Sequence, residues 1–92
     1  MEWIGSEKQI GWAQKIVAEF TAEINEVLAE VDAAEPSELS ADAVTVIAEL
    51  KRGLARLQRV RSARWIIDTA RVIGADATIT RLADPAYKLR SI

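Results

Sequence analysis

The chain has 92 residues, half of them apolar, and a formal net charge of −2, which allows one domain with a modest core. It contains no Cys and no His, which excludes disulfides, thiol nucleophiles, imidazole general bases and metal sites built from thiolate or imidazole. The charges are sorted by position: residues 1–50 hold eleven Asp/Glu against two Lys, and residues 51–92 hold ten Lys/Arg against three Asp. Such asymmetry suggests that the charge has a role, either inside the molecule or against a partner.

The sequence carries no signal for a membrane or for secretion. No apolar run approaches the ~20 residues of a membrane-spanning helix, and the first residues lack the basic region and apolar stretch of a signal peptide. The absence of Cys fits a reducing compartment. We therefore expect a soluble, cytoplasmic protein that binds no membrane.

The first predicted helix spans residues 7–31. It opens with a capping box, because the Ser6 hydroxyl can accept from the backbone N–H of Gln9 while the Gln9 side chain reaches back to Ser6. Apolar residues then recur in alternating steps of three and four, which forms a heptad seam over three heptads. The seam consists of Ile10, Ala13, Val17, Phe20, Ile24, Val27 and Val31. Such a narrow seam suits a long antiparallel hairpin or a coiled-coil partner.

A second helix is predicted over residues 38–59, with Ser37 or Ser40 as its N-cap. A break at Pro36 separates it from the first helix. An unbroken continuation would put Arg61 in the centre of the apolar side, where an unpaired guanidinium is costly to bury. We therefore expect the second helix to bend or end close to this residue.

A third, shorter helix is predicted over residues 63–73, with Ser62 as its N-cap and Gly74 just after its end. Gly53 interrupts the second helix and costs roughly 1 kcal/mol relative to Ala there. Either it allows another backbone to approach closely, or the helix simply tolerates it.

The remaining tail, residues 75–92, has mixed apolar residues and a break at Asp84-Pro85. A short helix is expected within it near Thr78–Ala83. No repeat or long linker divides the chain, so residues 1–92 are predicted to form a single all-α domain. Its architecture is a long antiparallel helical hairpin with a shorter third helix and a partly ordered C-terminal tail.

Two charged stripes are predicted from the helical periodicity. With each apolar side facing the core, four Glu of the first helix fall together on its opposite side, and three Arg of the second helix do the same. The stripes are Glu19, Glu23, Glu26 and Glu30, and Arg52, Arg56 and Arg59. Both would turn outward, where exposed ion pairs are worth only ~0–1 kcal/mol. They serve either solubility or a partner.

Trp12 is unusual, because this large aromatic residue falls on the polar side of the first helix. A Trp in that position is either covered by the chain itself, through the C-terminal tail or Trp3-Ile4, or presented to a partner. Trp3 could also fold back as a staple on the first turn. Trp65 in the third helix is the other candidate anchor for a partner.

Nucleic-acid binding is one function that the basic half suggests, since phosphate contacts need clustered Lys and Arg. The candidate residues are Lys51, Arg52, Arg56, Arg59, Arg61 and Arg64. The acidic half would repel a duplex unless it points away.

The class that we favour is a protein-interaction module, in which the Glu stripe, the Arg stripe and Trp12 contact a partner. The two stripes could also join copies of the chain into a homo-oligomer. Catalysis is not expected, because the sequence has no phosphate-cradling Gly loop and no nucleophile beside a plausible base. Glu-rich helices can hold metal ions, but the His partner of such sites is missing. We therefore expect no cofactor and no metal.

Two segments carry a family resemblance. Gly5–Ala13, followed by Ile16, resembles the opening of small uncharacterised helical proteins of phages and mobile elements, which often read G-[ST]-x-K-Q-I-x-W-A-x-x-I. Ser62–Asp68 is similar to a later segment of those proteins, with Ile66 where a second aromatic residue usually stands. The resemblance covers about a quarter of the chain and carries no assigned activity. It implies an accessory protein of a phage or mobile element, and by analogy an inhibitor of the anti-CRISPR type.

Overall fold

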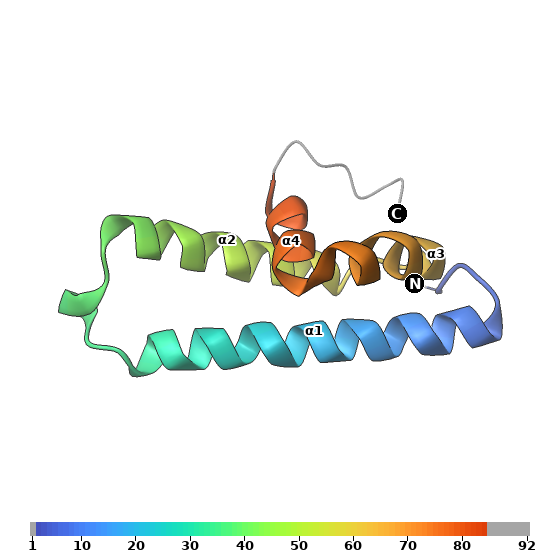
Figure 1. The fold of residues 1–92 in the computed structure, drawn as a ribbon, viewed down its shortest axis with the longest axis horizontal. Coiled ribbons are helices and arrows are strands. Elements are labelled where there is room, and N and C mark those ends of the chain that lie inside the picture. The colour runs from blue at the N-terminus through green and yellow to red at the C-terminus, as the bar shows by residue number, and fades with distance from the viewer. Residues whose placement is uncertain (1, 85–92) are drawn as a thin grey trace.

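The computed structural model describes residues 2–84, which form an all-α fold from a long hairpin and a third helical segment (Figure 1). Two long helices run antiparallel along the molecule, and a short 3₁₀ helix lies in the turn between them. The chain then returns as three consecutive helical elements, of which all three pack against the first long helix and the last also packs against the second. The elements are α1 (Glu7–Ala33), η1 (Pro36–Glu38), α2 (Ala41–Leu57), α3 (Ala63–Trp65), the π-helix η2 (Ile66–Ala70) and α4 (Arg71–Ala83). The predicted fold class is confirmed.

Both long helices begin at side-chain caps. Ser6 Oγ accepts from the Gln9 N–H at 3.2 Å, and Gln9 Oε1 accepts from the Ser6 N–H at 3.1 Å, which completes the predicted capping box. α2 begins at Ala41 and not at residue 38, because Ser40 is its N-cap and accepts from a backbone N–H at 3.1 Å. α1 continues to Ala33, two residues beyond its predicted end.

The turn after α2 shows how the chain accommodates Arg61. α2 stops at Leu57, two residues before the predicted end. The Arg61 Nη1 group donates to the carbonyl oxygens of Gln58 at 2.6 Å and Val60 at 2.8 Å. The same guanidinium lies over the Trp3 ring, 5.5 Å from its centroid. The helix therefore ends before Arg61 would enter the core, as predicted.

The third helical segment consists of α3, η2 and α4. It is a continuous helical run over residues 63–73, followed by a kink. Ser62 caps this run, as predicted, with its Oγ accepting a backbone N–H at 3.2 Å. Gly74 ends the run, because its φ of 86° lies in the left-handed region that favours glycine. A further stretch over residues 75–83 begins three residues earlier than predicted. The rest of the predicted tail, residues 85–92, lies outside the described part of the chain.

Gly53 is the point where α4 crosses α2. A Cβ atom at Gly53 would overlap the backbone carbonyl oxygen of Ile79. Of the two interpretations of this glycine, close approach of another backbone is confirmed. The crossing closes a core of fully or nearly fully buried side chains, which are Ala13, Ile16, Ile24, Leu57, Val60, Ala63, Ile66, Ile67, Ala70, Ile79 and Leu82.

The N-terminal segment makes a contact that the sequence did not predict. The Ile4 N–H donates to the Arg61 carbonyl oxygen at 2.7 Å, and the Ile4 carbonyl oxygen accepts from the Ala63 N–H at 3.0 Å. This bridge holds Trp3 against the core. Trp3 lines a groove along the middle of α1, and the staple on the first turn stays a prediction.

The heptad seam of α1 is not buried along its whole length. Ile16 lies outside the seam and is buried, whereas Val27 lies inside it and is 40% exposed. The reason is that α3, η2 and α4 pack toward one end of the hairpin, so that within residues 2–84 the other end consists of the two long helices and the turn between them (Figure 1). We call residues 25–50 the distal hairpin and the rest of the described chain the core lobe.

Candidate functional site

Within residues 2–84, no third layer of helix lies over the distal hairpin (Figure 1). None of residues 25–35 and 37–50 is buried. All of the charged side chains in this region are acidic: Glu26, Glu30, Asp32, Glu35, Glu38, Asp42 and Glu49. An acidic surface with half-exposed apolar residues is the first candidate for contact with a partner.

The Glu stripe runs along α1 into this region. All four of its residues are exposed, and none of their carboxylates forms an ion pair or a hydrogen bond within residues 2–84. Glu30 lies five full turns after Trp12, so both project from the same flank of α1. Trp12 faces Arg71 of the third helical segment, so the stripe borders that segment. The sequence-based prediction that the stripe lies opposite the core is therefore wrong.

The Arg stripe is not turned outward as a whole, which corrects the sequence-based prediction. The Arg56 Nη1 group donates to the carbonyl oxygens of Leu82 at 2.6 Å and Asp84 at 2.8 Å, and Arg56 is partly buried. The Arg52 Nη1 group donates to the Ala83 carbonyl oxygen at 3.3 Å. These carbonyls are at the C-terminus of α4, where the helix leaves its acceptors unpaired and favours positive charge.

The other basic candidates are split between internal and free positions. Arg61 bonds the carbonyls of the turn after α2, and Arg64 Nε lies 3.2 Å from Asp68 Oδ2. Lys51 and Arg59 are exposed, and their side chains bond nothing within residues 2–84. The six predicted nucleic-acid contacts are therefore not one continuous set of free cations.

The Trp residues are used in different ways. Trp12 remains 46% exposed, and the Arg71 guanidinium lies over its ring at 4.8 Å from the centroid. Trp3 packs against the core and lines a groove on the other flank of α1, so it does not cover Trp12. Ile4 pairs with Ser62 in the loop before α3, and the tail that was the other predicted cover is outside the described residues. Trp65 is partly buried and packs against the core, which leaves Trp12 as the more accessible anchor.

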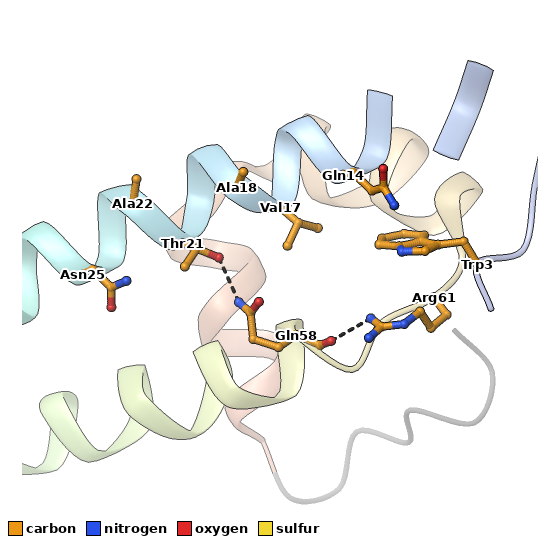
Figure 2. Close-up of a pocket in the computed structure, with 9 residues that line it drawn as sticks. All are labelled: Trp3, Gln14, Val17, Ala18, Thr21, Ala22, Asn25, Gln58 and Arg61. Carbon is orange, nitrogen blue, oxygen red and sulfur yellow. Dashed lines mark hydrogen bonds between the residues drawn. The ribbon is translucent and has the colours of Figure 1, made fainter. Parts of the chain in front are cut away.

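An open groove of about 530 Å³ lies on the opposite flank of α1 from the Glu stripe. Figure 2 shows Trp3 closing one end beside Gln14, while Gln58 Nε2 donates across to Thr21 Oγ1 at 2.8 Å. The lining consists of Trp3, Gln14, Val17, Ala18, Thr21, Ala22, Asn25, Gln58 and Arg61. It holds no carboxylate, and its one charged side chain, Arg61, already bonds two backbone carbonyls. The groove therefore offers amide and hydroxyl contacts, without an acid–base pair.

Residues 2–84 offer neither a cluster of acidic ligands nor a membrane-spanning helix. No group of three or more Asp or Glu side chains comes together there in a way that could hold a metal ion. No helix in the same part of the chain is long and apolar enough to cross a membrane.

Comparison with family models, with curated proteins and with solved structures finds no match to this chain.

Proposed function

We propose that this protein is a non-catalytic protein-interaction module that docks on a basic partner through its Glu stripe and distal hairpin. The observation that carries the proposal is a difference in how the charges are used. Arg52, Arg56, Arg61 and Arg71 contact carbonyls or aromatic rings of the chain itself. The Glu stripe contacts no charged group within residues 2–84. Its negative charge is therefore available to steer and orient a partner.

The resemblance to accessory proteins of phages and mobile elements suggests what such a partner does. A row of carboxylates can occupy a surface that otherwise binds phosphates. We propose that the protein inhibits a cytoplasmic, nucleic-acid-handling complex of the host in this way, by analogy with inhibitors of the anti-CRISPR type. The Glu stripe and the resemblance together support the proposal that the protein is an inhibitor.

Direct nucleic-acid binding by the basic stripe is the alternative. Lys51 and Arg59 favour it, because both are exposed and their side chains bond nothing else in the described chain. The internal use of Arg52 and Arg56 reduces the charge that remains for phosphates. The alternative therefore predicts a weak, salt-sensitive complex.

The first test compares two variants with the same change in net charge. Glu23→Gln, Glu26→Gln and Glu30→Gln together remove three charges from the stripe. Glu2→Gln, Glu7→Gln and Asp76→Asn remove three exposed charges from the core lobe. Proteins retained from a bacterial lysate by the wild type and the second variant, but lost with the first, support the proposal. Equal retention by all three would contradict it.

The second test measures mass by light scattering, with and without a 20-base-pair duplex, at low and moderate salt. We expect no DNA complex at moderate salt. A complex that survives there, and is lost in Arg59→Gln, would replace the proposal by the alternative. The same measurement without DNA gives the oligomeric state.

A further inference from the structure

Two contacts define which side of the hairpin the third helical segment covers. On α1, Trp12 points to Arg71, whose guanidinium lies 4.8 Å from the ring centroid. On α2, Gly53 touches the backbone at Ile79. The side of the hairpin that carries Trp12 and Gly53 is therefore the covered side in the core lobe.

The same side continues along the distal hairpin, where none of the described helices covers it. Val46 lies seven residues before Gly53, which is almost two full turns, so it projects toward the same side of α2. Val27 lies about 60° from the direction of Trp12, toward the core. Val46 is 51% exposed and Val27 is 40% exposed. We call Val27, Val46 and the half-buried Val31, which lies one turn after Val27, the distal strip.

Acidic residues border the distal strip on both helices. Glu23 and Glu30 project within about 20° of the direction of Trp12 on α1. On α2, Glu49 lies seven residues before Arg56, the residue that reaches across to the end of α4, and therefore projects toward the same side. All three carboxylates are exposed and unpaired within residues 2–84.

We propose that the distal strip binds an amphipathic helix of the partner, with one apolar row flanked on both sides by Lys or Arg. Such a helix would continue the layer that α4 begins, and its cations would meet the acidic borders. The inference rests on the proposed function and names the chemistry of the partner. Residues 75–83 already pack on this side of α2 in the core lobe, at Gly53.

Charge decides among the occupants of an apolar strip. A second copy bound strip to strip would bring the acidic borders of both copies together, which costs free energy. Anionic lipid and nucleic acid would be repelled for the same reason. A basic helix is the occupant for which the apolar contacts and the charges agree.

The probe for this inference is an 18-residue peptide with Leu at helical spacings of three and four and Lys on both flanks. Its binding to the full-length protein is followed by fluorescence anisotropy of a labelled peptide. The control peptide has the same composition in an order that destroys the apolar row. We expect the ordered peptide to bind at least tenfold more tightly than the control peptide.

Matched protein variants locate the binding site. Val44 is 54% exposed and lies nine residues before Gly53, which places it on the opposite side of α2 from Val46. Val46→Ser should weaken binding of the ordered peptide about five- to tenfold, because a half-exposed valine loses its burial against the helix, while Val44→Ser should leave it unchanged. Glu30→Gln with Glu49→Gln should weaken it further, whereas Asp32→Asn should not.

The outcomes separate this inference from the proposed function. If ordered and control peptides bind equally, charge alone attracts partners, and the inference is wrong while the proposed function stands. If neither peptide binds, or if Val44→Ser weakens binding as much as Val46→Ser, the strip is not a helix site. A dimer that Val46→Ser converts to monomer would make a second copy the occupant and would also overturn the inference.

Discussion

The core lobe and the distal hairpin are built from the same two helices and differ in almost everything else. In the core lobe a third helical segment covers the hairpin and buries its apolar side chains, and four arginines contact carbonyls or rings of the chain itself. In the distal hairpin, none of residues 25–35 and 37–50 is buried, and every charged side chain is acidic. The core lobe uses these four arginines to hold the fold, whereas the distal hairpin leaves all of its carboxylates exposed.

The difference arises from the chemistry of the two kinds of side chain. A guanidinium has five donors in a fixed fork and can satisfy the carbonyl oxygens that a helix end leaves unpaired. A carboxylate is only an acceptor, and the middle of a helix offers it no free donor. Basic residues beside helix ends thus become structural, while a row of Glu in mid-helix stays free for recognition.

Among the substitutions that test this comparison, Gly53→Ala should change the free energy of unfolding most. Alanine favours a helix by about 1 kcal/mol over glycine, but its Cβ would overlap the Ile79 carbonyl oxygen and push α4 away from α2. Overpacking against a backbone should cost about 3 kcal/mol of unfolding free energy. Urea denaturation measures the loss.

Gly11→Ala is the matched control, because a Cβ there meets nothing within 4 Å. It should stabilise the protein by about 0.5–1 kcal/mol. If both substitutions stabilise the protein, α4 does not pack closely on α2 at Gly53, and the contrast between the core lobe and the distal hairpin is wrong.

Arg56→Gln should have the next largest effect. The substitution removes the hydrogen bonds to Leu82 and Asp84 at the C-terminus of α4, and we expect a loss of about 1.5 kcal/mol. Arg59→Gln removes the same charge from an exposed neighbour in the stripe and should change stability by less than about 0.5 kcal/mol. Equal urea midpoints for the two variants would mean that the arginines of the core lobe are not structural.

The fold was largely predictable because its signals are local. The capping box at Ser6, the break at Pro36 and the left-handed Gly74 each act through the backbone next to them, and each marked a true boundary. Arg61 also indicated that α2 ends before it, within two residues of the observed end at Leu57, because a buried guanidinium without partners is costly.

The site was less predictable because it depends on contacts between distant segments. A helical wheel places Arg56 on the outer side of α2, and no sequence pattern shows that the end of α4 will arrive there with free carbonyls. The same holds for the Ile4 bridge to the loop before α3. The Glu stripe was found correctly as a set, but its flank relative to the third segment needed the position of Arg71.

Neutralising the Glu stripe should raise stability slightly. Glu19, Glu23, Glu26 and Glu30 are spaced three or four residues apart, and like charges at these spacings destabilise a helix by about 0.2–0.5 kcal/mol per pair. The variant with Glu23, Glu26 and Glu30 changed to Gln should therefore be more stable by up to about 1 kcal/mol at low salt, and the gain should shrink at high NaCl concentration. A loss of stability would show that the stripe has a structural partner and would remove the contrast between the two regions.

The smallest effect should come from Arg64→Gln. Arg64 and Asp68 form an ion pair one helical turn apart, with side chains 85% and 60% exposed. Pairs of this kind contribute about 0.3–0.5 kcal/mol at most, so the urea midpoint should shift within experimental error. Arg56→Gln and Arg64→Gln remove the same charge from the same lobe, and they differ in what the guanidinium meets: helix-end carbonyls in one case and an exposed carboxylate in the other. A large loss of unfolding free energy in Arg64→Gln would mean that exposed ion pairs stabilise the core lobe. The absence of ion pairs at the Glu stripe would then no longer indicate a surface that is free for a partner.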